Sequence, residues 1–171
     1  YMLAGKDMKR YERDVHKDLQ GVDLVAAWRA QFEDTAAAYM EADPSQRCVW
    51  AGPSMSARSS ISARQMETWS HAQAIYDVLG KHRVETDRLR NIIVLGVNTF
   101  GWSFQVRGES VPEIKPFLEL LAPSGEVWHF NEPSEVNVIR GAATEFAQIV
   151  TQTRNVADTA LEMVGEVANA W

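Results

Sequence analysis

The sequence of 171 residues contains one cysteine, Cys48, and no long hydrophobic run. A single cysteine excludes a disulfide within the chain, and free thiols are typical of reducing compartments. No window approaches the run of about 18 apolar residues that a membrane-spanning helix needs. The opening residues also lack the basic-then-apolar order of a secretory signal peptide. We therefore expect a cytoplasmic protein without a membrane partner.

The chain has no excess of positive charge. It holds 17 Lys and Arg against 23 Asp and Glu, which gives a net charge of −6. Proteins that bind the phosphate backbone usually present a basic face, so no nucleic-acid partner is expected. Apolar residues make up 46% and charged residues 23% of the chain, as in ordinary globular proteins. These features favour one or two small domains with a hydrophobic core.

Helix-breaking residues are missing from residues 57–79, which contain neither proline nor glycine. This stretch therefore predicts one helix of about six turns. Pro53 marks a loop before it, and Ser54 or Ser56 can cap its start by accepting from free backbone N–H groups. Gly80 stands where a C-terminal stop is expected.

Glu67 and His71 lie four residues apart in this predicted helix, so they share one face, one turn apart. They interrupt an apolar stripe formed by Ile61, Ala63, Ala74, Ile75 and Val78. Burying two ionisable groups is costly unless a partner satisfies them, and a divalent metal ion could bind both. A solvated or internally hydrogen-bonded pair is the alternative. Two ligands do not complete a catalytic zinc site, which usually has three protein ligands and a water.

The other histidines and the cysteine are weaker candidates. His16 lies on a charge-rich amphipathic segment, His82 in a basic loop, and His129 on an expected edge strand. Exposed side chains are the simpler expectation for all three. No histidine lies close to Cys48 in the sequence, so a catalytic thiol is not expected there.

The chain changes character near residue 110. Before it, the apolar spacing predicts helices at residues 1–20, 23–42, 57–79 and 86–107. Asp23 is expected to cap the second of these helices, and Gly108 to end the last. The aromatic residues of the second helix are expected in a bundle core: Trp28, Phe32 and Tyr39. After it, strands are expected at 117–121 and 127–130, joined as an antiparallel hairpin, and at 135–139 and 158–164, with helices from 142 to about 153 and from 166. We predict an α+β fold: a helical bundle of residues 1–110 and a small antiparallel-sheet α+β domain of residues 111–171.

The run WAGPSMSARSSISARQMETWSHAQ at residues 50–73 resembles the signature of a bacterial family of metal-binding proteins. This family is similar to the metal-binding domain of mycothiol-dependent maleylpyruvate isomerase, in the DinB/YfiT-like superfamily. The stretches TDRLRN at 86–91, LGV at 95–97 and VTQTRNVADTAL at 150–161 resemble the family as well. The resemblance implies a DinB-like bundle of up-and-down helices, a four-helix bundle, that holds a divalent ion, zinc or nickel.

By this resemblance, Glu67 and His71 are two of the metal ligands. The third ligand in the family is a histidine in an earlier helix, within a stretch resembling Gly-Trp-Thr followed by six residues and His. No such stretch occurs here, and the family pattern would place it before Tyr1. We therefore expect this chain to be an incomplete view of a longer protein, and the third ligand stays open.

The resemblance also implies an enzyme that acts on a small-molecule substrate and uses a low-molecular-weight thiol for isomerisation or S-transfer, because a metal ion can stabilise the thiolate nucleophile. Activated water would support hydrolysis instead. Arg154 matches a C-terminal-domain arginine that faces the metal in the isomerases, and it could bind a substrate carboxylate as a two-pronged donor. An ion pair, with Asp158 for example, is the alternative. Arg64 could contact Glu67, and Asp77 could orient a ligand or face solvent.

A second hypothesis belongs to a different class of protein. Here the metal is structural, and the α+β domain holds a small apolar or acidic molecule without turnover. A closed sphere of four ligands would favour this binding protein, whereas an open position facing Arg154 would favour the enzyme. A homodimer is a further expectation, because bundles of this family often pair.

Overall fold

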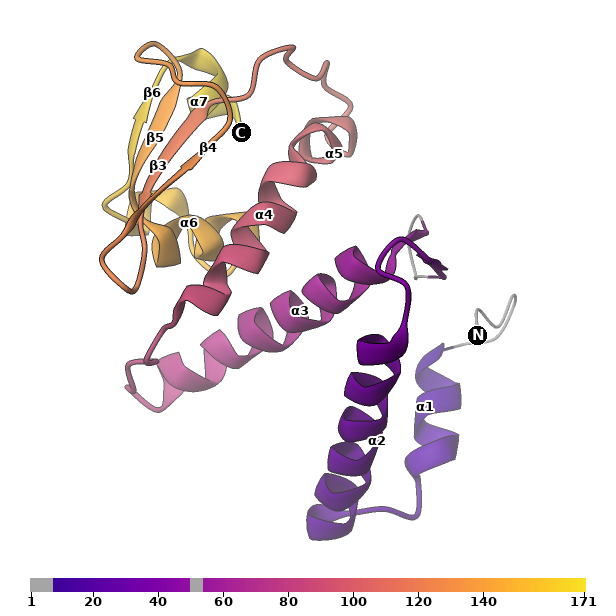
Figure 1. Ribbon diagram of the computed structural model, residues 1–171. Coiled ribbons are helices and arrows are strands. Elements are labelled where there is room, and N and C mark those ends of the chain that lie inside the picture. Colours follow the sequence, from indigo (N-terminus) through magenta and orange to yellow (C-terminus); the bar gives the residue numbers. More distant parts are fainter. Residues whose placement is uncertain (1–7, 50–53) are drawn as a thin grey trace. The chain divides into compact units, whose positions relative to one another are not determined.

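The computed structural model describes residues 8–49 and 54–171, and contacts divide the chain into two compact units, Tyr1–Ile61 and Ser62–Trp171 (Figure 1). Helices and strands occur together, which agrees with the predicted α+β class. The predicted domain boundary at residue 110 falls inside the second unit. That boundary and the DinB-like bundle stay predictions.

The first unit contains α1 (Met8–His16), α2 (Gly21–Glu41), the strands β1 (Arg47–Cys48) and β2 (Met55–Ser56), and the start of α3 (Ala57–Val78). The two strands form a small antiparallel pair. Residues 1–7 of the first predicted helix and Pro53 lie outside the described residues. The second predicted helix is confirmed as α2, but Asp23 lies in its first turn rather than at its cap.

The aromatic residues of α2 differ from their predicted role. Trp28 and Phe32 were expected in a bundle core, but both are exposed and stack on each other with ring centroids 6.0 Å apart. Stacking hides part of each ring from water. Tyr39 is half-buried, and its hydroxyl group lies 2.6 Å from the Ser60 hydroxyl. The apolar face of α2 is therefore only partly covered within the described residues.

The predicted limits of α3 are confirmed. Ser56 Oγ accepts a hydrogen bond from the Ser59 backbone N–H at 3.2 Å, which makes Ser56 the cap. At the other end Gly80 adopts a left-handed φ of 59°, and the Lys81 N–H donates to the Tyr76 carbonyl at 3.0 Å. This is the geometry that glycine allows at a helix C-terminus.

The helix expected at residues 86–107 is interrupted. It consists of a 3₁₀ turn (Asp87–Leu89), α4 (Arg90–Asn98) and α5 (Phe100–Gln105). Thr99 stands at the break, where its hydroxyl group donates to the Leu95 carbonyl at 2.9 Å. Such side-chain bonds to the preceding turn tend to bend helices. Gly108, with φ of 73°, ends the segment as predicted.

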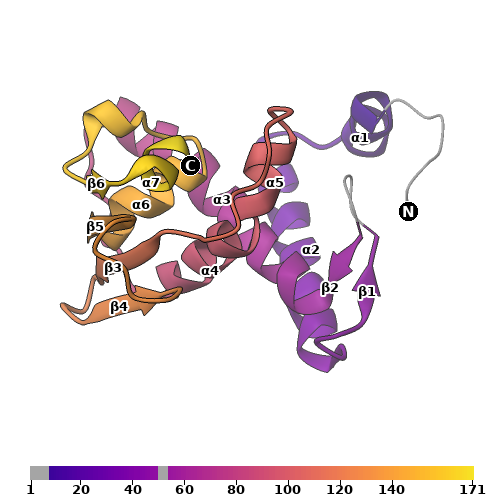
Figure 2. The same ribbon diagram turned by 90° about the horizontal axis from the view of Figure 1, so that it is seen from above.

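The second unit also contains a four-stranded sheet with the order β4-β3-β5-β6 (Figure 2). Its strands are β3 (Phe117–Leu121), β4 (Val127–Phe130), β5 (Val138–Ala142) and β6 (Glu162–Val164), and its helices are α6 (Ala143–Val150), a 3₁₀ turn (Val156–Asp158) and α7 (Glu166–Ala170). The β3–β4 hairpin is antiparallel, as predicted.

The third predicted strand is shifted, and the sheet is mixed rather than antiparallel. Ser134 Oγ accepts from the N–H groups of Val136 and Asn137, which prolongs the turn, so β5 begins at Val138. The chain leaves β4 beside the start of β3. The turn at residues 131–137 then passes this end of β3, and β5 begins along its opposite edge. Therefore β5 runs parallel to β3. The antiparallel prediction is wrong for this pair.

The core of the second unit lies between the sheet and its helices. α6 packs against β3, β5 and α4 (Figure 1). The buried side chains come from α4, the strands and α6: Ile92, Ile93, Val97, Leu118, Leu120, Trp128, Ile139, Phe146 and Ala147. Met66 and Trp69 of α3 pack against this core. Over residues 8–49 and 54–171, no helix has both the length and the apolar character that crossing a bilayer requires.

A test of this core is Gly96→Ala, because a Cβ atom at Gly96 would lie 2.9 Å from Val150 Cγ2 and 3.1 Å from Val150 Cβ. Valine is stiff, so we expect overpacking to lower the free energy of unfolding by about 1–3 kcal/mol. Urea denaturation measures this change. Gly101→Ala is the control, since its Cβ would meet Val111 at an ordinary 3.5 Å. Equal losses in both variants would contradict the close approach of α4 and α6.

Candidate functional site

Glu67 and His71 lie together on α3, as their spacing predicts. Glu67 Oε2 is 3.2 Å from His71 Nε2, and the side chains are 47% and 83% exposed. The apolar residues that follow on this face are exposed too, with Ile75 at 62% and Val78 at 86%. The pair is thus a solvated contact between helix neighbours rather than a buried one. The contact expected between Arg64 and Glu67 stays a prediction.

The other face of α3 packs into the second unit. Met66 and Trp69 contact the hydrophobic core, and the side chains of Ser70 and Gln73 are buried. This burial sets the rotation of the helix, because the two faces lie on opposite sides of its axis. The Glu67–His71 pair therefore points away from the core of its own unit.

The pair offers the right donor atoms for zinc or nickel, one carboxylate oxygen and one imidazole nitrogen. It is nevertheless an incomplete donor set. Among residues 8–49 and 54–171, no group of three or more His, Cys, Asp or Glu side chains is placed to hold a metal ion. His16 and His82 are exposed elsewhere, and His129 lies 3.7 Å from Glu119 instead. The pair fits a metal only together with ligands from outside this group.

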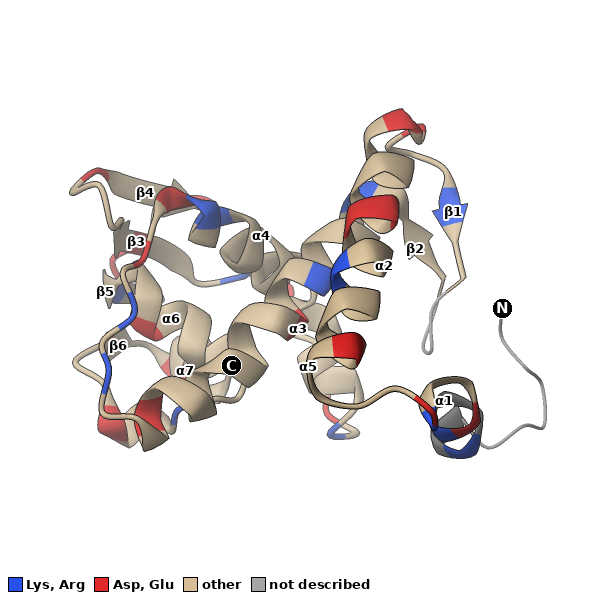
Figure 3. Ribbon diagram, turned by 90° about the horizontal axis from the view of Figure 1, so that it is seen from below, with Lys and Arg blue, Asp and Glu red and all other residues tan. Residues whose placement is uncertain are grey.

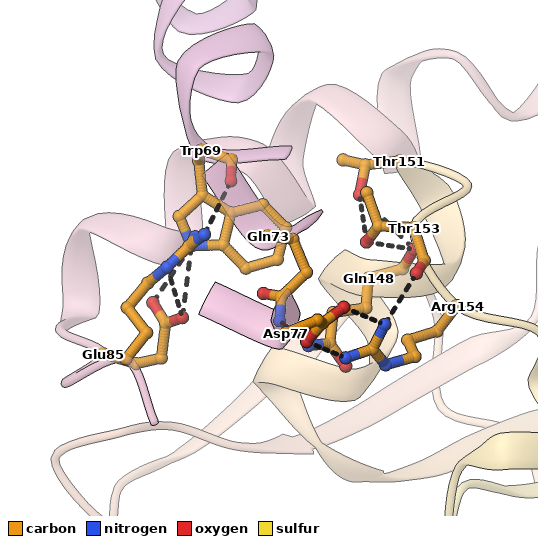
Figure 4. Close-up of polar contacts among 9 residues, drawn as sticks. Trp69, Gln73, Asp77, Glu85, Gln148, Thr151, Thr153 and Arg154 are labelled. Atoms are coloured by element: carbon orange, nitrogen blue, oxygen red, sulfur yellow. Dashed lines mark hydrogen bonds and ion pairs between the residues drawn. The ribbon is translucent and has the colours of Figure 1, made fainter. Parts of the chain in front are cut away.

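Arg154 forms an ion pair with a residue that the sequence did not indicate as its partner. Its Nη1 donates to Asp77 Oδ2 at 2.8 Å and its Nη2 to Asp77 Oδ1 at 2.6 Å (Figure 4). The Gln73 side-chain amide donates to the same carboxylate at 2.9 Å. The partner weighed from the sequence, Asp158, acts on Arg154 only by longer-range attraction. This two-pronged ion pair between Asp77 and Arg154 joins the end of α3 to the segment after α6.

A turn after α6 directs Arg154 toward α3. Gln152 adopts a left-handed φ of 59°, which reverses the chain after the last helical turn. The backbone N–H and the hydroxyl group of Thr153 then both donate to the Gln148 carbonyl, at 2.9 and 3.1 Å. Arg154 Nη1 also donates to the Thr153 carbonyl at 3.1 Å. Figure 4 shows Arg154 leaving this turn toward Asp77.

The electrostatics of this pair favour the charged forms. The hydrogen bonds from Arg154 lower the pKa of Asp77 to about 2, with further contributions from Gln73 and from the charge of Arg83. The same hydrogen bonds raise the pKa of Arg154. Asp77 is therefore ionised at neutral pH and occupies the two-pronged face of Arg154.

Sequence reasoning also missed the contacts of Arg83, because they depend on the fold. Its guanidinium group lies between two rings, 4.8 Å from the centre of Trp69 and 4.7 Å from that of Tyr76. It donates to the Trp69 carbonyl at 2.9 Å, and Trp69 Nε1 donates to Glu85 at 3.0 Å (Figure 4). Cation–π contacts of this kind stabilise a largely desolvated cation. The cluster holds the loop after α3 against the helix.

Charged positions of both signs are interspersed along the ribbon (Figure 3). On the sheet, Arg140 lies 3.3 Å from Glu119 and 2.8 Å from Glu135, so its charge is matched by carboxylates. Mixed charge of this kind does not resemble the basic stripe of a phosphate-backbone binder. That the protein lacks a nucleic-acid partner stays a prediction.

Comparison with known proteins relates this chain to one family. Residues 2–76 match the model of a family described as the mycothiol maleylpyruvate isomerase N-terminal domain, a range that includes Glu67 and His71. Two proteins from two strains of Mycobacterium tuberculosis, both described as uncharacterized, are 36% identical to it over 150 residues. These matches cover 87% of this chain and 58% of each relative, so the chain spans little more than half of their length. No solved structure matches. The family match supports the predicted link to the mycothiol maleylpyruvate isomerases.

We expect Asp77→Asn to lower the melting temperature at neutral pH and to lose this effect in acid. The pKa of Asp77 is about 2 in the folded chain against an ordinary 3.8. The charged form therefore stabilises the fold above about pH 4, and this contribution disappears as the pH falls toward 2. Because the side chains of Asp77 and Arg154 are 40% and 31% exposed, solvent screening keeps the effect modest. Thermal unfolding from neutral pH to about pH 2 measures it.

Asp158→Asn is the matched control, since it removes a carboxylate that attracts Arg154 only at longer range. It should change the melting temperature less than Asp77→Asn does. A deficit in Asp77→Asn that is the same at both ends of the pH range would show that the ion pair is not its cause.

Proposed function

We propose that this chain carries two ligands of a divalent metal in a metal-dependent, thiol-using enzyme related to the mycothiol-dependent maleylpyruvate isomerases. Glu67 and His71 supply these ligands, zinc is the first choice of ion and nickel the second. The observation that carries this proposal is the 3.2 Å contact between Glu67 Oε2 and His71 Nε2 on an accessible helix face. The family match, which spans both residues, supports it.

The donor set limits what the pair can do alone. A catalytic zinc site usually has three protein ligands and one open position. The described residues provide two at this point, so a further ligand must join them from elsewhere. A metal held there would lower the pKa of a bound thiol or water, which favours thiol-dependent isomerisation, S-transfer or hydrolysis.

Arg154 is the residue that we propose for a substrate carboxylate, because guanidinium groups bind carboxylates through two parallel hydrogen bonds. Both of its terminal nitrogens already contact Asp77. A substrate carboxylate would therefore have to compete with Asp77 for the same donors. We expect small, acidic substrates to bind through this exchange.

The contact between Arg154 and Asp77 also favours a second candidate function. If Asp77 keeps Arg154 permanently, the arginine is structural and the protein binds a small molecule without turnover, with a metal that only stabilises the fold. The two candidates differ in whether added carboxylates weaken the Asp77–Arg154 pair. Protection of the Arg154 guanidinium protons, followed by NMR with and without a small dicarboxylate, distinguishes them.

The double variant Glu67→Gln with His71→Ala tests the metal assignment. We expect it to lose bound zinc or nickel, measured by elemental analysis, while circular dichroism shows an unchanged fold, because the Glu67 and His71 side chains are 47% and 83% exposed. Metal retained in this variant would refute the assignment.

The chain offers a matched control in Glu119→Gln with His129→Ala, which removes the other Glu–His contact, at 3.7 Å. Glu119 is already engaged by Arg140. We expect this control to bind as much metal as the unaltered chain.

A further inference from the structure

The Asp77 carboxylate is attracted by two arginines that differ in exposure. Arg154 binds it through two hydrogen bonds, whereas Arg83 lowers the pKa of Asp77 by its charge alone. The side chain of Arg154 is 31% exposed, and that of Arg83 is only 11% exposed. A molecule from solution therefore has access to Arg154, while Arg83 stays inside the fold.

The turn at the end of α3 brings Arg83 back along the helix, to the face that carries Asp77. Gly80 reverses the chain with its left-handed φ, and the Arg83 guanidinium group then lies on the rings of Trp69 and Tyr76. Trp69, Tyr76 and Asp77 stand at positions i, i+7 and i+8 of α3, so they share one face of the helix. Arg83 is thus held along the same face as Asp77.

Arg83 has hydrogen-bond donors to spare. Its Nη2 donates to the Trp69 carbonyl at 2.9 Å, but the buried Nε and Nη1 atoms have no hydrogen-bond partner among residues 8–49 and 54–171. Glu85 Oε1 lies 3.7 Å from Nε, too far for a hydrogen bond, and the Glu85 carboxylate accepts from Trp69 Nε1 instead. Unused donors on a buried cation are costly, so Arg83 would gain from a further carboxylate.

This arrangement suits the exchange of carboxylates proposed above for Arg154. A substrate carboxylate that takes both donors of Arg154 leaves Asp77 without its two strongest hydrogen bonds. The Gln73 amide remains 2.9 Å from Asp77, and Arg83 is the other cation that acts on this carboxylate. Pairing with Arg83 would offset the loss, because a carboxylate that is deprived of its cation is costly to keep.

We propose that Arg83 is a positioning residue for acidic substrates: it receives Asp77 when a substrate carboxylate displaces Asp77 from Arg154. This proposal rests on the substrate-binding role proposed above for Arg154. Arg83 does not contact the substrate and acts only through Asp77. The affinity for an acidic substrate therefore depends on two arginines, although one of them alone binds it.

A double-mutant cycle with succinate as the probe tests this role. We expect Arg83→Gln to weaken succinate binding by about fivefold, because ion pairs of partly exposed side chains are weak. Asp77→Asn should tighten binding, since it removes the group that competes with succinate for Arg154. In the Asp77→Asn background, Arg83→Gln should have no further effect. NMR titration of the full chain, followed at the Arg154 guanidinium signals, measures the Kd.

Arg90→Gln is the matched control. Arg90 also lies on two aromatic rings of the second unit, 6.0 Å from the centre of Trp128 and 5.5 Å from that of Phe130. It is not among the groups that lower the pKa of Asp77. The control thus removes the same charge and the same kind of ring contact, and we expect it to leave the Kd for succinate unchanged.

Arg83→Gln also removes the ring contacts that hold the loop after α3, so a second measurement uses the unaltered chain. The NMR signals of the Arg83 guanidinium protons should shift downfield as succinate binds, because a carboxylate then accepts from them. The same signals should stay in place when succinate is added to Asp77→Asn.

The outcomes separate this proposal from the proposed function. Succinate that binds with the same Kd in Arg83→Gln would refute the role of Arg83 and leave that of Arg154 intact. The same conclusion holds if Arg83→Gln weakens binding equally in the Asp77→Asn background, or if saturating succinate leaves the Arg83 signals unmoved. Succinate that binds neither the unaltered chain nor Asp77→Asn would refute both roles.

Discussion

The packing of Met66 and Trp69 against the core fixes the rotation of α3, and the arrangement of the second unit depends on it. With these side chains inward, Asp77 meets Arg154 from the segment after α6, and the Gln73 side chain donates to the same carboxylate. The same rotation leaves Glu67 and His71 on the accessible side of the helix. The Asp77–Arg154 pair and the Glu67–His71 pair therefore have different surroundings, because one face of α3 packs on the core and the other is accessible.

The Asp77–Arg154 pair and the Glu67–His71 pair differ in whether their polar atoms all have partners. The ion pair between Asp77 and Arg154 is complete in itself, since both terminal guanidinium nitrogens and both carboxylate oxygens have partners. The Glu67–His71 pair has donor atoms to spare, and its geometry suits a cation that the described residues alone do not enclose. The Asp77–Arg154 pair holds the segment after α6 against the end of α3, whereas the Glu67–His71 pair is open to a ligand from outside.

Local signals in the sequence predicted some elements well and could not predict others. Ser56 and Gly80 set the ends of α3, and the short loop between the strands expected at 117–121 and 127–130 predicted the β3–β4 hairpin, because caps and turns depend on neighbouring residues. The parallel pairing of β5 with β3 follows from the path of a turn across the sheet, which no local pattern records. The bond between Asp77 and Arg154 joins residues 77 positions apart, so it depends on the finished fold. The pairing of Glu67 with His71 needed only the helical repeat.

X-ray absorption at the zinc edge of the zinc-loaded chain tests most directly whether this face of α3 is a metal site. We expect a first shell of nitrogen and oxygen only, at about 2.0–2.1 Å, with the outer-shell scattering of imidazole. This imidazole signal should disappear in His71→Ala. A sulfur shell at about 2.3 Å would identify Cys48 as a ligand and contradict the assignment, as would imidazole scattering that His71→Ala leaves unchanged.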